Sequence, residues 1–249
     1  MTRRPQSPPQ PIRTLDETER KFLLGIDAVD ELLARFYAQG LSEEIHGEPG
    51  ARAFARTTYL DTNDFALYRS SFTSARRRLR IREYASAPPG EAPRLTGRCF
   101  LELKTSSGTR RAKERYEAAP ARVEEILEGL RPPDLPGGIE EVLDSYRLLP
   151  RMTTWYRRFS LANADASFRF TVDAEIQFCK PTQPRPAGEI ATPPALSSIV
   201  EGCIAEVKFA GPAPSWLDRA IAGLPEAPDF SKFRAGMEKV LGLDHLGNR

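Results

Sequence analysis

Residues 76–84 (RRRLRIREY) constrain the fold more than any other segment of this chain. Side chains in a strand alternate between two faces, so Arg78, Arg80 and Arg82 would lie on one face, with aliphatic residues on the other. Three neighbouring guanidinium groups repel one another, and such a face is stable only against water or a polyanion. The segment therefore predicts a strand whose apolar face packs in the protein and whose cationic face meets solvent or an anionic ligand.

The same alternation recurs in five further segments, residues 17–24, 99–105, 113–117, 168–178 and 203–209. For any one strand, alternation is also the ordinary sign of a sheet with one solvated face. Two features of the set favour another arrangement. In three strands an acid is followed two residues later by a base, and several predicted helices are amphipathic and need an apolar surface to cover. An arrangement with the charged faces inside and the apolar faces against the helices accounts for both features. The sequence therefore predicts a barrel with a charged interior.

A charged interior must be hydrated or filled by a charged ligand, because burying an isolated charge is energetically costly. Basic residues outnumber acidic ones on the predicted inner faces. Guanidinium groups bind phosphate oxygens in forked pairs, and the acids suit a divalent cation that shares those phosphates. The inner basic residues are Lys21, Arg78, Arg80, Arg82, Lys104, Lys113, Arg115, Arg158, Arg169 and Lys208, and the inner acids are Glu17, Glu19, Glu102, Asp173, Glu175 and Glu206.

Composition excludes several other kinds of site. The chain has 249 residues and a net charge of only +2, so anion binding would depend on how its charges are arranged. Its 2 histidines and 3 widely spaced cysteines argue against a histidine-based triad, a structural zinc site and a disulfide framework. A metal would then be a hard cation on carboxylates, such as Mn²⁺ or Mg²⁺. No apolar run is long enough to cross a bilayer, and the unpaired cysteines predict a cytoplasmic setting.

We expect the chain to consist of a tail and one domain. Residues 1–14 are basic and rich in proline, which predicts a disordered N-terminal tail. No boundary divides residues 15–249, so a single α+β domain with mostly antiparallel strands is predicted. The proline-rich residues 181–197 are expected to form an exposed insert of unassigned role. Periodicity predicts helices over residues 27–39, 121–129, 139–148, 216–223 and 232–241.

The motifs, taken in order, resemble those of a known superfamily. Residues 17–21 (ETERK) fit the ExExK signature of the triphosphate tunnel metalloenzymes, also called CYTH-like proteins. The whole set is most similar to the polyphosphate polymerase domain of the vacuolar transporter chaperone (VTC) complex and its stand-alone bacterial relatives. ExExK alone is a weak signal, whereas the ordered set over residues 15–242 is specific. It comprises ERKFLL (19–24), TTYLDTNDFALY (57–68), RLRIREY (78–84), FLELKT (100–105), TWYRRFSL (154–161), FRFTVDAEI (168–176), AEVKF (205–209) and DFSKFRAGME (229–238).

The resemblance implies an eight-stranded antiparallel β-barrel that forms a basic triphosphate tunnel, with helices packed outside. It also implies metal-dependent transfer of the γ-phosphate of ATP to a growing polyphosphate chain, with Mn²⁺ or Mg²⁺ as cofactor. Carried over by position, the catalytic residues would be Arg80, Arg82, Lys104, Arg158 and Arg169. The tunnel and phosphate contacts would be Lys21, Arg78, Lys113, Arg115, Lys208, Ser231 and Lys232, and the metal ligands would be Glu206, Glu19, Glu102 and Glu175. Instead of contacting phosphate, Ser231 could equally be a helix cap.

Two other functions are compatible with the sequence. A hydrolase on the same fold would cleave tripolyphosphate or another triphosphate, with water as the acceptor. A non-catalytic binder of polyanions or nucleic acid would use the arginine-rich strand. Exposed aromatic residues do not interleave with the basic ones as a base-stacking surface requires, so we expect no nucleic-acid partner. The expected partners are ATP and polyphosphate or another triphosphate, and the sequence identifies no membrane-protein partner.

Overall fold

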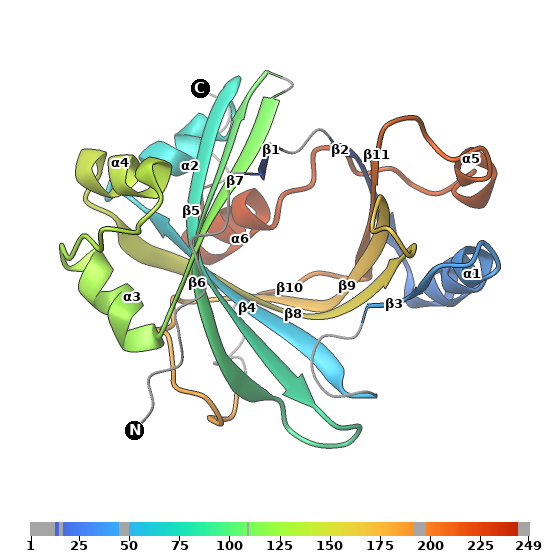
Figure 1. Ribbon diagram of the computed structural model, residues 1–249, viewed down its shortest axis with the longest axis horizontal. Coiled ribbons are helices and arrows are strands. Elements are labelled where there is room, and N and C mark those ends of the chain that lie inside the picture. Colours follow the sequence, from blue (N-terminus) through green and yellow to red (C-terminus); the bar gives the residue numbers. More distant parts are fainter. Residues whose placement is uncertain (1–12, 15–16, 45–49, 109, 192–197, 244–249) are drawn as a thin grey trace.

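The computed structural model describes residues 13–14, 17–44, 50–108, 110–191 and 198–243, which form one curled sheet with helices around it (Figure 1). None of the described helices is both long and apolar enough to cross a membrane. In chain order, the elements are β1 (Arg13–Thr14), β2 (Glu17–Leu24), α1 (Ile26–Tyr37), β3 (Ser42–Glu43), β4 (Arg52–Asp61), α2 (Ala66–Ser70), β5 (Ala75–Ala87), β6 (Arg94–Ser107), β7 (Arg110–Ala118), α3 (Pro120–Leu127), α4 (Gly137–Ser145), β8 (Leu149–Ala162), β9 (Phe168–Cys179), β10 (Ser198–Ile199), β11 (Cys203–Ala210), α5 (Leu217–Ala220) and α6 (Lys232–Leu241).

Eight long strands build the sheet, in the order β7-β6-β5-β4-β8-β9-β11-β2. All neighbouring pairs are antiparallel. The short strands β1, β3 and β10 pair with β7, β8 and β9. The sheet curls into a half-barrel, so that β5, β6 and β7 face β9, β11 and β2 across a concave interior (Figure 1). The predicted α+β class and the eight antiparallel strands are confirmed.

The two edges of the long sheet, β2 and β7, approach each other without a ladder between their described residues. The two-residue strand β1 pairs with β7 at Lys113 and Ala112. An ion pair of 2.8 Å joins Arg111 of β7 to Glu19 of β2. This side of the interior is therefore closed by a short strand and by side chains. Residues 1–12 of the predicted tail lie outside the described residues, whereas residues 13–14 belong to the sheet.

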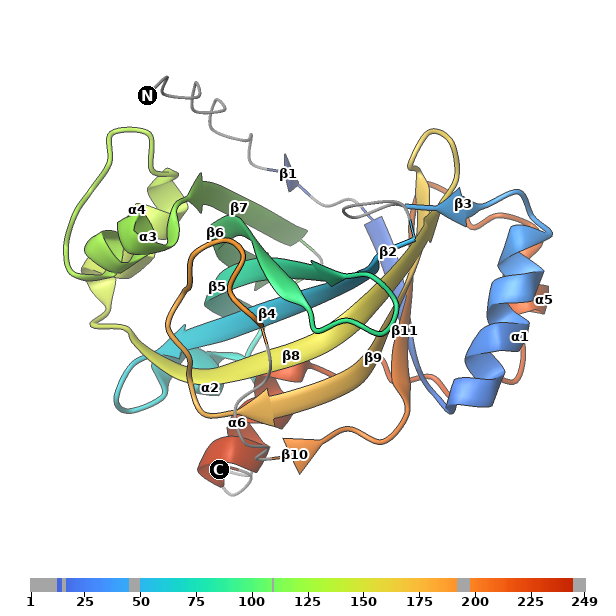
Figure 2. The same ribbon diagram turned by 90° about the horizontal axis from the view of Figure 1, so that it is seen from below.

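Helices cover the outer faces of the strands, where alternation places the apolar side chains. On one side, α1 and α5 pack over β2, β9 and β11 (Figure 2), and the rings of Phe36 and Phe170 meet edge to face with their centroids 4.5 Å apart. On the other side, α2, α3 and α4 pack against β5 and β6, around Leu79 and Leu101. The charged faces of the same strands are consequently turned towards the concave interior.

The last helix, α6, lies on the concave side of the sheet (Figure 1). Its Phe233 ring packs against Tyr59, with centroids 5.1 Å apart. A Cβ atom at Gly236 would lie 2.3 Å from Cε of Met152 in β8 and 2.8 Å from the ring of Phe178 in β9, so any larger residue would force these side chains to shift. This packing adds an inner helix to the predicted outer layer, and it places the start of α6 inside the concavity.

The proline-rich insert packs on the outer face of the sheet over residues 181–191, and residues 192–197 lie outside the described part of the chain. Arg56 and Glu83, both buried, form a two-point pair with distances of 2.8 and 2.7 Å. The backbone oxygen of Gln183 accepts from Arg56, and the backbone N–H of Arg185 donates to Glu83. The insert therefore covers a part of the sheet where a buried ion pair would otherwise meet water.

Candidate active site

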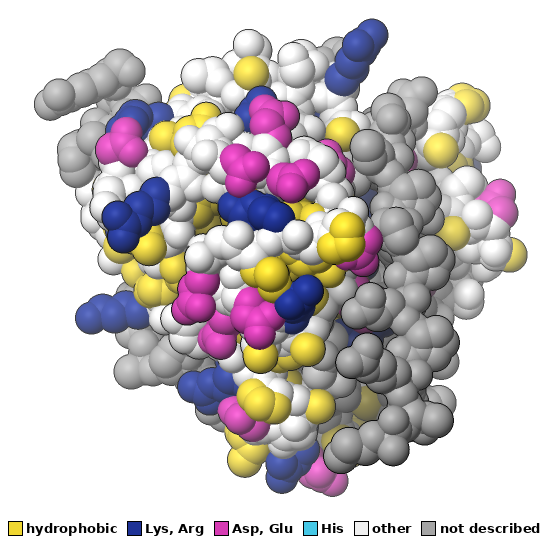
Figure 3. Space-filling view, turned by 60° about the vertical axis from the view of Figure 1, so that its left-hand side comes forward, with side chains coloured by type: hydrophobic (Ala, Val, Ile, Leu, Met, Phe, Trp, Pro, Cys, Tyr) yellow, Lys and Arg dark blue, Asp and Glu magenta, His cyan; other side chains and the backbone are white. Residues whose placement is uncertain are grey.

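The inner faces of the strands enclose a cavity of about 850 Å³. Its lining follows β5 from Arg76 to Ala85, which corresponds to roughly 30 Å of strand. Fourteen basic and four acidic side chains line it. Because the whole chain carries a net charge of only +2, the rest of the protein is net negative. The outer surface in Figure 3 accordingly shows acidic side chains interspersed among basic and hydrophobic ones.

The structure brings most of the predicted site residues to this one cavity. The exceptions are two of the predicted metal ligands, Glu102 and Glu175, which do not line it. The predicted residues that do line it are Lys21, Arg78, Arg80, Arg82, Lys104, Lys113, Arg115, Arg158, Arg169, Lys208, Ser231, Lys232, Glu19 and Glu206.

Glu102 lies in the wall of the cavity and has no exposed surface. It accepts from Arg80 at 2.7 and 2.9 Å, from Arg115 at 2.6 Å, and pairs with Lys113 at 2.8 Å. Burial raises the pKa of its carboxyl, but the charges of Arg80 and Lys113 outweigh burial and hold the pKa well below its usual value. Both carboxylate oxygens are occupied by cations, so the geometry suits Glu102 to holding basic side chains in place.

A row of basic residues crosses the strands next to Glu102. Arg78, Lys104 and Lys113 are direct cross-strand neighbours on β5, β6 and β7. Lys104, at the centre of the row, makes no ion pair with a described carboxylate. The charge of Arg80, burial and the charge of Lys208 together lower the pKa of Lys104 well below its usual value. Like charges directly opposite one another destabilise a sheet, so an anion bound between the members of this row would stabilise it.

Three further polar atoms in the cavity wall have no hydrogen-bond partner among the described residues. They are Nε of Arg82, Nε of Arg169 and Oγ1 of Thr171. Arg82 is only 4% exposed and lies over the rings of Tyr84 and Tyr156, at 5.0 and 5.8 Å from their centroids. Buried polar atoms of native proteins are almost always hydrogen-bonded, so these atoms mark positions that a ligand would satisfy.

Acids and bases alternate between β2 and β11. Glu206 faces Lys21 across the ladder, and Lys208 faces Glu19. Nζ of Lys208 lies 2.8 Å from the carboxylate of Glu206 and 4.0 Å from that of Glu19. Burial raises the pKa of Glu206, but Lys208, Lys232 and Lys21 outweigh it and hold the pKa well below its usual value. The carboxylates of Glu206 and Glu19 thus both lie within ion-pair distance of Lys208, and Glu19 also pairs with Lys21 at 3.2 Å and with Arg111 at 2.8 Å.

A buried carboxylate ties α6 to the sheet. Asp173 of β9 binds Arg158 through two contacts of 2.7 Å, and it binds Nζ of Lys232 at 2.6 Å. The adjacent Ser231 is the N-cap of α6, because its Oγ accepts from the backbone N–H of Arg234. The same Oγ is 3.3 Å from a guanidinium nitrogen of Arg78. Ser231 is therefore the cap of α6 and also a residue of the cavity lining.

Glu175 is the predicted site residue that the structure places on the outer surface. Its side chain is 53% exposed and pairs with Arg157 at 3.1 Å. The pairing of β8 with β9 shifts between Trp155 and Arg157, opposite Glu175, and Glu175 has a φ of 54°. A bulge of this kind interrupts the alternation of faces. Strict alternation, on which the prediction depended, therefore ends before Glu175.

Sequence reasoning missed several residues of the site. Tyr156 lines the cavity, buried among Arg82, Arg158 and Lys232. Burial raises the pKa of its hydroxyl, but Arg82 and Arg158 outweigh burial, and the net pKa is lowered. Alternation along β8 could have found it, because Tyr156 is two residues from Arg158. Arg76, Arg98 and Arg111 also line the cavity.

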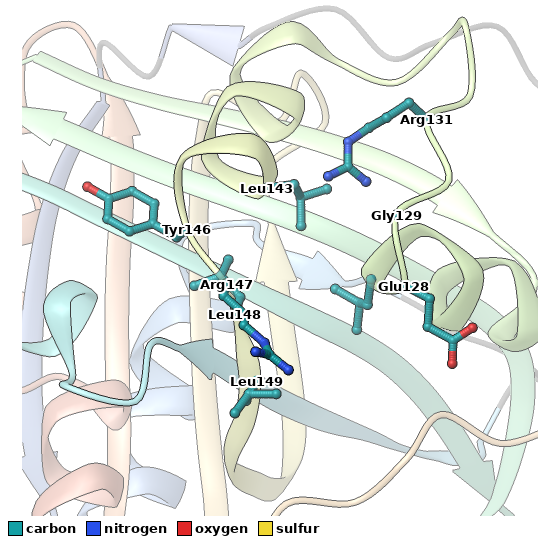
Figure 4. Close-up of a pocket in the computed structure, with 9 residues that line it drawn as sticks. Glu128, Gly129, Arg131, Leu143, Tyr146, Arg147, Leu148 and Leu149 are labelled. Carbon is teal, nitrogen blue, oxygen red and sulfur yellow. The ribbon is translucent and has the colours of Figure 1, made fainter.

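A second cavity, of about 390 Å³, lies between α3, α4 and the start of β8. Figure 4 shows Arg131 and Arg147 together with Leu143 and Leu148 in its lining. Arg131 is already paired with Asp144 at 2.9 Å. This cavity shares no lining residue with the larger one and carries no comparable excess of basic side chains.

One titration in the larger cavity leads to a pH prediction. Burial lowers the pKa of Lys113 to about 7, although Glu102 opposes the change. A bound polyanion favours the charged ammonium, so binding takes up a proton above pH 7. We expect the affinity for tripolyphosphate to fall by up to about 10-fold per pH unit as the pH rises above 7. Isothermal titration calorimetry in buffers of different ionisation enthalpy measures both the affinity and the proton uptake.

The matched control for this pH dependence is Lys113→Arg. Arginine stays protonated throughout this range, so the variant should show a flatter affinity profile and less proton uptake. An identical profile in the variant would assign the titration to another group.

The fold is shared with a solved structure, and two further structures align less closely. A candidate adenylate cyclase from Bacillus halodurans aligns with a TM-score of 0.54 and 16% identity, over 89% of this chain and 97% of that one. A protein from Pyrococcus horikoshii OT3 aligns with a TM-score of 0.46 and 13% identity, over 90% of this chain and 99% of that one. A candidate adenylate cyclase from Vibrio parahaemolyticus aligns with a TM-score of 0.46 and 12% identity, over 91% and 99% of the two chains. A search of curated proteins gives no match.

An antiparallel half-barrel around a strongly basic cavity is the architecture of a triphosphate-tunnel protein, and the Bacillus structure shows the same fold. The family model of the VTC domain matches residues 16–241. The chain therefore belongs to the VTC domain family, as the order of its motifs predicted. Membership implies phosphotransfer or triphosphatase chemistry on triphosphate-type substrates, generally with a divalent metal.

Proposed function

We propose that this protein transfers the γ-phosphate of ATP to the end of a polyphosphate chain inside the cavity. The observation that carries the proposal is the row of basic residues Arg78, Lys104 and Lys113, whose central lysine has no carboxylate partner among the described residues. An enzyme of phosphoryl transfer needs positive charge on the phosphates and a fixed alignment of donor and acceptor. The cavity offers the positive charge, and its rigid strands would fix the alignment.

The roles of individual residues follow from their partners. Arg80 and Arg115 are held by Glu102, and Arg158 and Lys232 are held by Asp173, so these four cations are fixed before substrate binds. Preorganised charge of this kind stabilises a transition state because it needs no reorganisation during the reaction. Arg82, Arg169 and Lys104 lack such carboxylate partners in the part of the chain that the structure describes, and they would take the phosphates as their counter-ions.

The described residues fit a metal that is shared with the substrate. They contain no group of three or more histidine, cysteine or acidic residues placed to hold an ion by themselves. Glu206 and Glu19 nevertheless lie on either side of Lys208, with carboxylate oxygens 2.8 and 4.0 Å from its Nζ, and Mn²⁺ or Mg²⁺ commonly uses one or two carboxylates together with phosphate oxygens. When bound, the metal would neutralise charge on the phosphates.

The acceptor distinguishes synthesis from hydrolysis. The cavity lining extends along β5 from Arg76 to Ala85, a length that supports an extended chain better than a single triphosphate. Cations continue along this length, including Arg76, Arg111 and Arg98. A phosphate chain held there would place its terminal oxygen in line with the γ-phosphate, and no nucleophilic side chain would be required.

The experiment is incubation of the purified protein with ATP and Mn²⁺, followed by gel electrophoresis for polyphosphate. We expect a ladder of long chains that an exopolyphosphatase removes, together with one ADP per phosphate transferred. Release of inorganic phosphate without a ladder would assign a triphosphatase instead. Binding of RNA without ATP turnover would assign a polyanion-binding protein.

A substitution tests the metal site separately. Glu206→Gln keeps the size of the side chain and removes the charge that Lys208 binds at 2.8 Å. Loss of one of two carboxylates should raise the Mn²⁺ concentration required for half-maximal turnover by at least about 10-fold. The exposed Glu226→Gln serves as a control, because Glu226 pairs with Arg20 outside the cavity. An unchanged metal requirement in Glu206→Gln would remove Glu206 from the metal site.

A further inference from the structure

Asp173 does not line the cavity, but it contacts two cations that do. It is 2% exposed and lies opposite Arg158 in the pairing of β8 with β9. Its two oxygens accept from Nε and Nη2 of Arg158 at 2.7 Å each, and one of them also binds Nζ of Lys232 at 2.6 Å. One carboxylate therefore joins a strand residue to the first residue of α6.

Lys232 has two arginines near it, and Asp173 forms its only ion pair among the described residues, while the charge of Glu206 also attracts it. Its ammonium lies over the ring of Tyr156, 5.1 Å from the centroid, and the guanidinium groups of Arg158 and Arg82 lie 5.3 and 5.8 Å from the same centroid. Repulsion among three cations would move Lys232, the most flexible of them, away from the others. Asp173 is the carboxylate whose ion pairs oppose that movement.

The cluster of Asp173, Lys232, Arg158 and Arg82 carries a net positive charge that an anionic ligand would balance. One carboxylate between two cations leaves one positive charge, and Arg82 adds another without a carboxylate partner among the described residues. Both cations bound to Asp173 line the cavity. Their charged atoms lie within hydrogen-bond distance of one carboxyl group, which is close enough for a single phosphate to contact both.

We propose that Asp173 is a positioning residue: it holds Lys232 and Arg158 in one arrangement, so that the start of α6 and strand β8 grip the same phosphate. The proposal rests on the proposed function for its substrate class, a polyphosphate or triphosphate. It assigns to Asp173 no contact with the substrate. Its effect on phosphate binding passes through Lys232 and Arg158.

The test is a double-mutant cycle on tripolyphosphate binding, measured by calorimetry with the full chain. Asp173→Asn and Lys232→Met should each weaken binding about 10-fold, and the double variant should be no weaker than the weaker single variant. Coupling of this kind is expected when two residues act as one unit. Losses that multiply to about 100-fold would show that Asp173 does not act through Lys232 and would overturn the proposal. Unchanged binding in Asp173→Asn would overturn it as well.

A second variant keeps the test decisive if Asp173→Asn does not fold. Asp173→Glu retains the buried charge but lengthens the side chain by one methylene, which displaces the two cations. We expect about 5-fold weaker binding at an unchanged unfolding temperature, whereas wild-type affinity would overturn the proposal. Asp144→Asn, which removes the 61%-exposed partner of Arg131 on α4, is the matched control and should bind normally.

Failure of the positioning role and failure of the proposed function give different results. Tripolyphosphate binding requires no turnover, so coupling between Asp173 and Lys232 can be observed even if ATP yields no polyphosphate. In that case the proposed function falls and the positioning role stands. If ATP yields polyphosphate but the substitutions at Asp173 and Lys232 act independently, the proposed function stands and the positioning role falls. A wild-type protein that fails to bind tripolyphosphate would overturn both.

Discussion

Replacing Arg82 with glutamine should lower kcat/KM for ATP by about 100-fold and leave the unfolding temperature unchanged or higher. A hydrogen bond to a charged group contributes roughly 1.5–3 kcal/mol, and a factor of 100 in rate corresponds to about 2.7 kcal/mol. Arg82 is buried, has no carboxylate partner among the described residues, and its Nε has no hydrogen-bond partner among them. Its removal therefore relieves an unsatisfied buried donor in the empty protein and deprives the phosphates of a contact.

Steady-state kinetics and thermal unfolding of the same preparations check this prediction. Arg122→Gln is the control, because Arg122 lies on the exposed side of α3 and pairs with Glu125. It should change neither quantity. A fall in the unfolding temperature of Arg82→Gln that parallels the loss of activity would show that Arg82 supports the fold instead of the substrate.

Replacing Glu102 with glutamine should lower the free energy of unfolding by about 3–5 kcal/mol. Breaking a buried ion pair by removing one partner is this costly because it leaves uncompensated charge. Here three cations, Arg80, Lys113 and Arg115, lose a common carboxylate that has no exposed surface. Urea unfolding at neutral pH measures the effect.

Tripolyphosphate should restore part of the stability that Glu102→Gln removes, since the anion can compensate the same cations and stabilises the folded state by mass action. The gain at a fixed anion concentration should exceed that of the wild type. Glu117→Gln, which removes the exposed partner of Arg98, should cost less than about 1 kcal/mol. A variant at position 102 as stable as the wild type would contradict the role of Glu102 in holding the three cations.

Alternation of charged and apolar residues predicted most of the sheet. The predicted segment 203–209 became β11, and the arginine-rich segment extended as β5 to Ala87. The proline and glycine residues of segment 86–97 predict a loop there. The structure needs only a short turn there, since β6 begins at Arg94. Turn residues locate a turn, but the strands on either side lengthen as far as their neighbours offer hydrogen bonds.

Helix α2 was not predicted, and its cause lies in tertiary structure. The carboxylate of Asp61 accepts from the backbone N–H groups of Leu67 and Tyr68 at 2.9 and 2.8 Å. Asp61 is the last residue of β4, too far along the chain to be recognised as an ordinary cap. A helix of five residues stabilised in this way has no periodic pattern of its own to detect.

The sequence predicts which side chains of the candidate site share a face of a strand, because side chains alternate along it. It does not predict which side chains meet across neighbouring strands, because that depends on the register of strand pairing. Alternation predicts the faces of Lys21 and Glu206, but only the register of β2 against β11 shows that they face each other. The role of Asp173 depends in the same way on its position opposite Arg158 and on the approach of α6. The bulge at Glu175 is a feature of paired strands and has no counterpart in the sequence of β9 alone.

The seam between β2 and β7 has a mechanical consequence. A barrel closed by a full ladder can widen only by breaking a row of backbone hydrogen bonds. Here the contacts between described residues are the two-residue pairing of β1 with β7 and the ion pair of Arg111 with Glu19, and a pair of this exposed kind contributes about 0–1 kcal/mol. The cavity should therefore widen more easily along the seam between β2 and β7 than along the fully paired strands. A bulky end of a long phosphate chain would enter or leave at this seam at the least energetic cost.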